Sequence, residues 1–281
     1  MVWSIEGKTV VVTGASSGIG KMAALELARR GARLVLLCRN PQKASEVANE
    51  AKSIGRYEPG VVIADMASLA EIRRAADEIK QTHERIDVLI NNAGAFHSAR
   101  TATLDGYETT FAVNHLGYFL LTDLLLDRLK KSAPARIVNV ASHAHRRGTI
   151  KFDDLQRTKW NGGDAYAQSK LANILFSNEL AHRLEGSGVT SNALHPGVVA
   201  TRFAAGTGGP VGLFFKVFRP LLRSESDGAK TTVHLACGPE LPIASGGYYA
   251  DERPSKQSKE AGDAAIAKRL WEVSEKLVAS K

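Results

Sequence analysis

Cysteine is scarce in this chain of 281 residues, which contains only Cys38 and Cys237. Two cysteines argue against a disulfide framework and against a zinc module built on cysteine ligands. We therefore expect no bound metal and a protein that works in a reducing compartment, which we take to be the cytoplasm.

Long hydrophobic runs are missing as well. The apolar stretches, such as residues 119–121, are far shorter than the about 20 residues that a membrane-spanning helix needs. The chain opens on polar residues, without the basic and apolar regions of a secretory signal. We expect a soluble protein without a membrane anchor.

Acidic residues are outnumbered, because 37 lysines and arginines face 29 acidic residues and give a formal net charge of +8. The basic residues are scattered along the chain, and no recognition-helix or RNA-binding signature accompanies them. We therefore expect no nucleic-acid partner. A phosphate-rich cofactor or an anionic membrane surface would explain the charge equally well.

What the sequence does contain is a regular alternation of short apolar runs with helical patterns. The alternation implies right-handed crossovers between strands that are buried on both faces. Strands are predicted at residues 9–12, 33–38, 61–63, 87–90, 136–140 and 190–194, and helices at residues 19–30, 42–53, 69–82, 107–130 and 165–184. The predicted fold class is α/β: residues 1–281 form a single Rossmann-type domain, with a doubly wound parallel sheet of about seven strands and helices on both faces.

A glycine-rich segment, residues 13–20 (TGASSGIG), follows the first strand and opens the first helix. In this position glycines let the backbone approach a pyrophosphate, and the N–H groups of the helix start face the anion. The spacing is neither G-x-G-x-x-G nor that of a Walker loop. A tight structural turn is the alternative, but three glycines at this place favour a dinucleotide site.

The end of the second strand lacks the carboxylate that would hold the ribose 2′-hydroxyl of NAD. Residues 37–40 read LCRN instead, and the guanidinium of Arg39 is suited to a 2′-phosphate. We therefore favour NADP(H) over NAD(H). The alternative is that Arg39 is one solvated charge of a basic protein.

The catalytic signal is the pair Tyr166 and Lys170, which are four residues apart and share one helix face. Tyrosine has an ordinary pKa near 10, and a neighbouring ammonium stabilises its phenolate. Ser142 follows the strand at residues 136–140, so it lies at a carboxyl end of the sheet, where open α/β proteins bind ligands. The pattern predicts hydride transfer between a nicotinamide and an alcohol or carbonyl, with Tyr166 as general acid and base.

Taken together, these features resemble the short-chain dehydrogenase/reductase family over almost the whole chain. The matching motifs are residues 13–20, Asp65, residues 91–94, Asn114, Ser142, the Tyr166/Lys170 pair and residues 196–197. The resemblance implies four catalytic residues. Tyr166 is the general acid and base, Ser142 orients the substrate oxygen, Lys170 binds the nicotinamide ribose and lowers the pKa of Tyr166, and Asn114 holds a relay water.

The resemblance also implies a cofactor site. Asp65 and Asn91 are expected at its adenosine end, and residues 196–201 over the nicotinamide. The complete expected set is Gly14, Ser16, Ser17, Gly18, Ile19, Gly20, Arg39, Asp65, Met66, Asn92, Ala93, Gly94, Tyr166, Lys170, Pro196, Gly197, Val199 and Thr201.

Within the family the chain looks most like the retinol-dehydrogenase-like branch. The resembling stretches are residues 37–39, 113–117, 133–140, 169–173, 194–199 and 270–274. The Cys38-Arg39 pair matches the NADP-type signature of that branch. The chain departs from it at Ala141, where a second serine is usual, and in the expected lack of an N-terminal anchor.

Two stretches interrupt the alternation: a polar insertion at residues 143–163 and a segment rich in glycine and phenylalanine at residues 202–224. One interpretation makes residues 202–224 a lid over a bulky, lipophilic alcohol or carbonyl substrate of retinoid, steroid or long-chain type. A second places residues 211–223 on an anionic membrane surface. A third packs the segment on the protein's own core or on a second subunit. A homo-oligomer is expected by analogy with the family.

Other functions remain open at this point. The chain also fits a nucleotide-sugar epimerase or dehydratase, although its C-terminal tail is short for one. A catalytically silent dinucleotide sensor would show damage in the Asn, Ser, Tyr and Lys set, and none is seen. His143, His145 and His195 lie near the expected site, but carboxylate and thiolate partners at metal-ligand spacing are missing.

Overall fold

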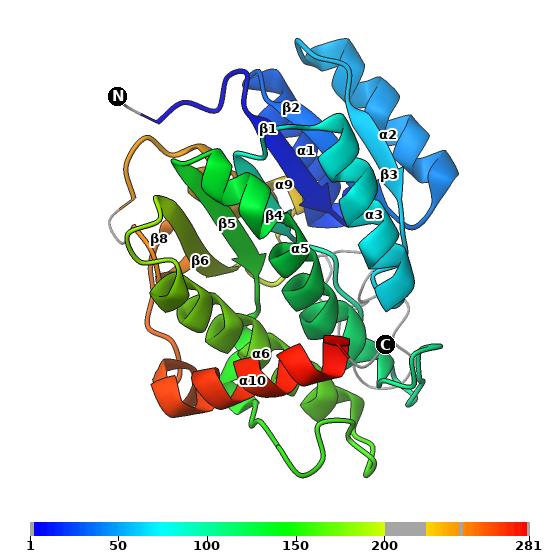
Figure 1. Cartoon of the computed structure of the whole chain (residues 1–281), viewed down its shortest axis with the longest axis vertical. Coiled ribbons are helices and arrows are strands. Elements are labelled where there is room, and N and C mark those ends of the chain that lie inside the picture. Colours follow the sequence, from blue (N-terminus) through cyan, green and yellow to red (C-terminus); the bar gives the residue numbers. More distant parts are fainter. Residues whose placement is uncertain (1–2, 200–222, 242–243, 280–281) are drawn as a thin grey trace.

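A single sheet forms the centre of the molecule (Figure 1). The computed structural model describes residues 3–199, 223–241 and 244–279. The strands are β1 (Thr9–Thr13), β2 (Arg33–Cys38), β3 (Gly60–Ile63), β4 (Val88–Asn91), β5 (Ala135–Val140), β6 (Val189–His195), β7 (Tyr248–Ala250) and β8 (Arg253–Pro254). Their order is β3-β2-β1-β4-β5-β6-β7-β8, and all pairs are parallel except β7 with β8. The doubly wound fold is confirmed, with a two-residue antiparallel edge strand added to it.

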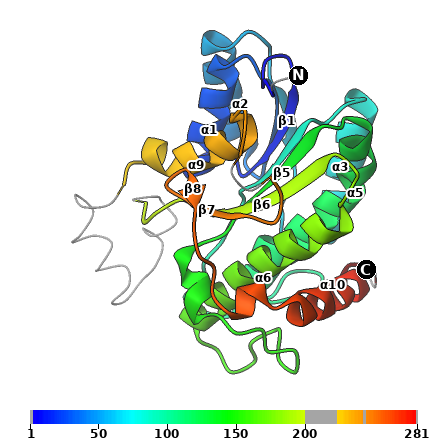
Figure 2. The same ribbon diagram turned by 90° about the vertical axis from the view of Figure 1, so that its left-hand side faces the viewer.

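Helices cover both faces of the sheet (Figure 2). On one face lie α1 (Gly18–Arg29), α2 (Pro41–Ile54) and α9 (Glu225–Cys237). On the other lie α3 (Leu69–Thr82), α5 (Gly117–Lys131) and α6 (Gly162–Arg183), with α10 (Ala264–Ala279) packed on α6.

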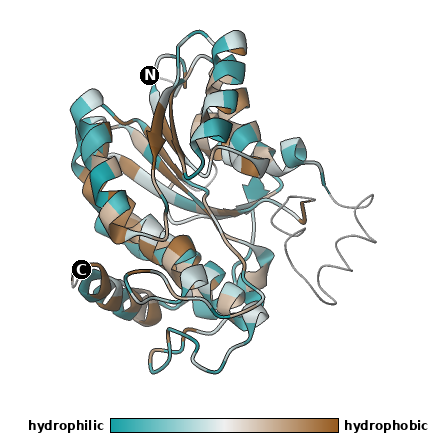
Figure 3. Cartoon of the chain, turned by 90° about the vertical axis from the view of Figure 1, so that its right-hand side faces the viewer, coloured by the Kyte–Doolittle hydropathy of each residue, from teal (hydrophilic) through white to brown (hydrophobic). Residues whose placement is uncertain are grey.

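The strands are apolar on both faces because each face is buried. In β1, Val10 and Val12 join the core under α1, whereas Val11 joins the core under α3, α5 and α6. All three are fully buried. Figure 3 shows the hydrophobic residues concentrated in these strands, between the two helix layers.

The helix predicted at residues 107–130 is interrupted in the structure. It consists of α4 (Thr109–Phe111), the π-helical turn η1 (Ala112–Leu116) and α5. The carboxylate of Glu108 starts it by accepting hydrogen bonds from the N–H groups of Thr110 and Phe111, at 2.7 and 2.8 Å. A π-turn inside a helix is often found at a functional site, and this one carries Asn114.

The polar insertion contains a short 3-10 helix, η2 (His143–Arg147), directly after Ser142. The predicted lid at residues 202–224 and the predicted membrane contact at residues 211–223 lie outside the described residues, apart from Arg223 and Ser224. Thr201 lies outside them as well. In the part of the chain that is described, no helix combines the length and apolar character needed to cross a membrane.

Candidate active site

One cleft of about 1360 Å³ collects the residues that the sequence singled out. It lies where β1, β2, β4, β5 and β6 end, which is the edge of the sheet that binds ligands in open α/β proteins. Every described residue of the expected cofactor set lines it, and so does Ser142. Asn114 is absent from the lining.

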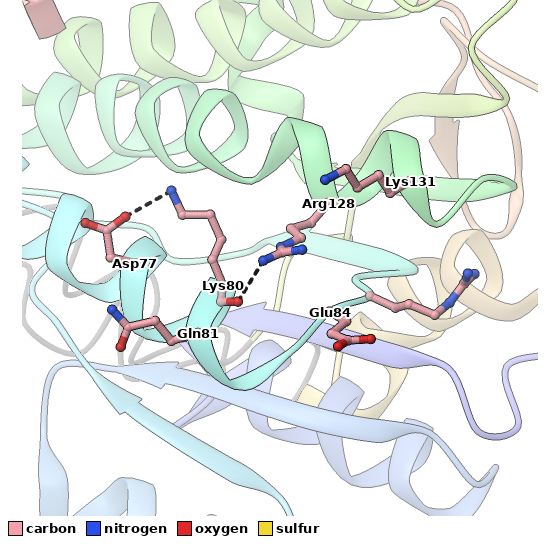
Figure 4. Close-up of a pocket in the computed structure, with 7 residues that line it drawn as sticks. Asp77, Lys80, Gln81, Glu84, Arg128 and Lys131 are labelled. Carbon is pink, nitrogen blue, oxygen red and sulfur yellow. Dashed lines mark hydrogen bonds and ion pairs between the residues drawn. The ribbon is translucent and has the colours of Figure 1, made fainter.

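A second hollow lies between α3 and α5, near the start of β4 (Figure 4). Its lining is charged: Asp77, Lys80, Gln81, Glu84, Arg85, Arg128 and Lys131. Lys80 pairs with Asp77 at 2.9 Å, and Arg128 donates to the Lys80 carbonyl at 3.1 Å. None of the expected catalytic residues lines this hollow, so the larger cleft is the candidate active site.

The glycine-rich segment, residues 13–20, which we call the phosphate loop for its expected ligand, packs against the segment that follows β4. Gly14 has a φ of +64°, and a Cβ there would lie 2.8 Å from the Cα of Ala93. At Gly20 a Cβ would lie 2.3 Å from the Nδ2 of Asn92. Thr13 fixes the two segments together, because its Oγ1 accepts from the N–H groups of Asn92 and Ala93 at 2.8 and 2.9 Å. Only glycine suits these two positions.

The start of α1 is left open to an anion. Its N-cap residue, Ser17, makes no side-chain cap, and the first turn has no acidic residue. In contrast, α2, α3, α6 and α9 are capped by side chains, those of Asn40, Ser68, Asn161 and Ser224. The unpaired N–H groups and the helix dipole suit a phosphate. With the glycine cradle, the residues present therefore fit the pyrophosphate of a dinucleotide.

At the end of the cleft where the adenosine is expected, Arg39 and Asp65 lie next to each other in the lining. The guanidinium Nη1 lies 3.6 Å from the Asp65 carboxylate, and the Arg39 side chain is 78% exposed. Lys43, in the first turn of α2, also lines the cleft and was missed by the sequence reasoning. A basic residue near Arg39 was the signal that could have revealed it.

We expected Asn91 at the adenosine end of the cofactor, but its side chain does not line the cleft. Its side chain is fully buried and donates to Thr122 Oγ1 and to Asn139 Oδ1, at 3.0 and 2.9 Å. Asn91 is the last residue of β4, and its side chain points to the layer of α5 rather than to the cleft. The next residue, Asn92, lines the cleft instead.

Tyr166, Lys170 and Ser142 meet at the middle of the cleft. Ser142 hydrogen-bonds the side chain of Tyr166, and the Nζ of Lys170 lies 5.8 Å from the Tyr166 ring centroid. Burial raises the pKa of Tyr166 to about 12, and the bond from Ser142 offsets only part of this. Burial also lowers the pKa of Lys170 to about 7. Within the chain alone, burial therefore outweighs the lowering of the Tyr166 pKa that the sequence predicts.

The side chain of Asn114 connects the loop after β4 to α6 by hydrogen bonds. Its Oδ1 accepts from the N–H of Ala95 at 2.7 Å, and its Nδ2 donates to the Ala95 carbonyl and to Ser169 Oγ at 3.0 and 2.9 Å. Ser169 donates in turn to the Tyr166 carbonyl at 2.8 Å. The side chain expected to hold a water is thus engaged by the loop after β4 and by α6.

The apolar end of the cleft was largely missed by sequence reasoning. Phe96 packs edge-on against the ring of Tyr166, with centroids 5.8 Å apart. In the described part of the chain, the exposed large hydrophobic side chains are those of Leu104 and Val198, and both line this cleft. Exposed apolar groups at a cleft mark a surface for an apolar ligand. Leu104 gave little signal in the sequence, because it stands alone between Thr103 and Asp105.

The rings of His145 and His195, two of the three histidines near the site, are hydrogen-bonded. His195 Nδ1 accepts from the N–H of His143 at 3.1 Å. His145 bonds the Ser142 carbonyl through Nδ1 at 2.7 Å and accepts from the N–H of Ser258 through Nε2 at 3.2 Å. Across the described ranges there is no group of three or more side chains arranged to hold a metal ion.

The cleft, the uncapped start of α1 and the Tyr166–Lys170 pair are the features of a dinucleotide-binding oxidoreductase. The pattern of the family described as short chain dehydrogenase matches residues 8–208. The chain belongs to this family of oxidoreductases, which bind a nicotinamide dinucleotide, and it is similar to the retinol-dehydrogenase-like branch.

Two curated relatives support the branch. Human retinol dehydrogenase 13 is 46% identical over 283 residues, which cover 98% of this chain and 86% of that protein. Mouse retinol dehydrogenase 12 is 45% identical over 272 residues, covering 96% and 86%.

Solved structures agree with the fold. A crystal structure of an uncharacterized protein from Mycobacterium Paratuberculosis has a TM-score of 0.79 and 35% identity, and the match covers 99% of this chain and 96% of that one. A structure from Beutenbergia cavernae, described as an NAD(P)-dependent gluconate 5-dehydrogenase with bound NADP, has a TM-score of 0.72 and 29% identity, covering 88% and 96%.

Proposed function

We propose that this protein is an NADP(H)-dependent oxidoreductase that interconverts a bulky, lipophilic alcohol and its aldehyde or ketone. The observation that carries the proposal is the meeting of Ser142, Tyr166 and Lys170 in the same cleft as the phosphate loop. A reduced nicotinamide, when bound, supplies the hydride. The protein supplies the proton and the alignment of the substrate.

Tyr166 acts as the proton donor when a carbonyl is reduced. Its hydroxyl is bonded by Ser142, which also orients the carbonyl oxygen that receives the proton. Burial keeps the phenol protonated at neutral pH, since it raises the pKa of Tyr166 to about 12. In the oxidative direction the same hydroxyl must accept a proton, and the positive charges of Lys170 and of an oxidised nicotinamide then favour the phenolate.

Three observations support a preference for NADP(H). Arg39 lies at the end of β2 without a neighbouring carboxylate on that strand end, and Lys43 lines the same part of the cleft. Asp65 pairs with Arg39 from the end of β3 and holds the guanidinium at the cleft. The Beutenbergia cavernae structure carries NADP.

The substrate class rests on the lining of the other end. Phe96, Leu104 and Val198 offer apolar surface, and the relatives named retinol dehydrogenases act, by name, on a lipophilic alcohol. We propose that the aldehyde or ketone lies against Phe96, with its oxygen at Ser142 and Tyr166. The lid at residues 202–224, the membrane contact and a homo-oligomer stay predictions.

A substrate-panel assay tests the proposal. Purified protein is mixed with NADPH or NADH and a series of aldehydes and ketones, from acetaldehyde to retinal and a steroid ketone, and oxidation of the nucleotide is followed at 340 nm. We expect turnover with NADPH that increases with the apolar surface of the substrate. Tight NADPH binding without turnover across the panel would favour the dinucleotide sensor instead.

A further inference from the structure

A completely buried histidine follows Ser142 by three residues. This histidine, His145, lies on η2. Both of its ring nitrogens are hydrogen-bonded: Nδ1 to the Ser142 carbonyl at 2.7 Å, and Nε2 to the backbone N–H of Ser258 at 3.2 Å. The proposed function gives this ring no role, although it contacts the residue that is proposed to orient the substrate oxygen.

The two partners determine where the His145 ring carries its proton. A backbone N–H only donates, so Nε2 accepts from Ser258 and carries no proton. The Ser142 carbonyl only accepts, so Nδ1 carries the proton and donates to that carbonyl. The ring is therefore neutral. A second proton would turn an Nε2–H towards the N–H of Ser258 and break that bond.

The surroundings of His145 favour the neutral ring. Burial lowers its pKa, its bond to the carbonyl acts in the opposite direction, and the charges of Arg146 and His143 on the same short helix lower the pKa further. The titratable neighbours on other elements are Tyr248 on β7, with ring centroids 5.0 Å apart, and His195 on β6. Burial raises the pKa of Tyr248 to about 12, so none of these described neighbours is an anion at neutral pH.

The partner of Nε2 lies in a chain segment that is itself hydrogen-bonded on two sides. Ser258 belongs to the connection between β8 and α10, which Figure 2 shows passing from the sheet to the last helix. Arg146 donates to the Lys256 carbonyl, and Asn178 on α6 donates to Gln257 Oε1 at 3.1 Å. The connection is thus attached both to η2 and to α6, and it gives the His145 ring a fixed support.

We infer that His145 is a positioning residue for Ser142: its Nδ1–H holds the Ser142 carbonyl, and the connection after β8 holds the ring through Nε2. This inference rests on the proposed function, in which the Ser142 hydroxyl orients the carbonyl oxygen of the substrate. Holding the backbone of Ser142 limits where its hydroxyl can lie. Residues 255–259 thereby support the site although none of them lines the cleft.

Two variants separate the two bonds of His145. In His145→Asn the side-chain amide can donate to the Ser142 carbonyl in place of Nδ1, and the bond to Ser258 is lost. In His145→Gln the amide oxygen can reach the position of Nε2, and the bond to Ser142 is lost. We expect kcat for a bulky aldehyde with NADPH to fall about 100-fold in His145→Gln and less than about threefold in His145→Asn, while the Kd for NADPH stays the same in both.

The pair of variants also distinguishes positioning from a role in stability alone. Each variant loses one hydrogen bond to the backbone, so a purely structural role would lower the melting temperature and the activity of both by similar amounts. Equal kcat values in His145→Gln and His145→Asn, at the wild-type level or below it, would overturn the inference.

The pH dependence of alcohol oxidation gives a second readout. Burial raises the pKa of Tyr166 to about 12, and the hydrogen bond from Ser142 acts in the opposite direction. Oxidation needs the phenolate, so displacing Ser142 raises this pKa and moves the acidic limb of the kcat profile to higher pH. We expect the movement in His145→Gln and not in His145→Asn. Coincident profiles would contradict the positioning of the hydroxyl.

Two structural measurements do not depend on turnover. At neutral pH we expect the nitrogen chemical shifts of His145 in the wild-type protein to show a proton on Nδ1. In crystal structures we expect the Ser142 hydroxyl to be displaced from Tyr166 in His145→Gln and to keep its place in His145→Asn. A proton on Nε2, or an unmoved Ser142 in His145→Gln, would refute the inference. Both expected results in a protein that oxidises no NADPH would confirm the arrangement and refute the proposed function.

Discussion

The two ends of the cleft are built differently. At the phosphate end, the segments after β1 and β4 are tied by Thr13, and glycines allow them to touch. At the substrate end, Leu104 is fully exposed and Val198 is half exposed. The first end is therefore closely packed where we propose that the cofactor binds, whereas the second leaves apolar surface exposed where we propose that the substrate binds.

The largest expected effect comes from the point where the two ends meet. Replacing Tyr166 by Phe removes the proposed proton donor but keeps the ring that packs on Phe96. We expect kcat to fall about 10³-fold while the Kd for NADPH changes less than about twofold. Steady-state kinetics and nucleotide fluorescence titration measure the two values. An active Tyr166→Phe enzyme would contradict the mechanism.

A substitution in the phosphate loop should affect cofactor binding alone. In Gly20→Ala the added Cβ would meet the amide of Asn92 and the carbonyl of Gly14, at 2.3 and 2.5 Å. We expect the Kd for NADPH to increase about 100-fold, or about 3 kcal/mol. Gly60→Ala, in β3, is the matched control, because the nearest atom to its Cβ is 3.7 Å away. Equal Kd values for both variants would mean that the loop tolerates a side chain.

Lys170 makes the catalytic centre costly to fold. Its pKa is about 7 in the folded chain against an ordinary 10.5. Between these values the unfolded chain holds a proton that the folded chain has released, so the free energy of unfolding increases with pH across this window. Without nucleotide, we expect Lys170→Met to be more stable than wild type by about 2 kcal/mol at pH 7, and the difference to shrink towards pH 10. Urea unfolding at both pH values measures it, and a constant difference would contradict the shift.

We expect the choice of nucleotide to depend on Arg39, at the end of the cleft where the adenosine is expected. We expect Arg39→Gln to raise the Kd for NADPH about tenfold and to leave the Kd for NADH nearly unchanged, since only the 2′-phosphate loses a partner. Lys52→Gln, which removes an exposed charge on α2 outside the cleft, controls for the loss of positive charge. If both variants bind both nucleotides alike, Arg39 does not select the cofactor.

The smallest effect is expected from a substitution at the apolar end of the cleft. We expect Phe96→Ala to reduce kcat/KM for a bulky apolar aldehyde about fivefold, because the aromatic surface beside Tyr166 is lost. Acetaldehyde, which cannot reach that surface, serves as the internal control. A uniform loss for both aldehydes would show that Phe96 supports Tyr166 rather than the substrate.

Helices α9 and α10 were not predicted from the sequence. The sequence by itself determined the strands β1 to β6, the helices α1 to α6, the glycine-rich loop and the Tyr166–Lys170 pair. These follow from local patterns: apolar runs, glycine spacing and two residues one helical turn apart. The edge strands β7 and β8 were not located, because three and two residues carry too little periodicity.

Only the tertiary structure decided which way neighbouring side chains point. Asn91 and Asn92 are adjacent in sequence, yet one joins the buried polar core and the other lines the cleft. Tertiary packing also decided the protonation of the site, because burial raises the pKa of Tyr166 and lowers that of Lys170. Desolvation depends on what surrounds a group in space, and no spacing along the chain records it.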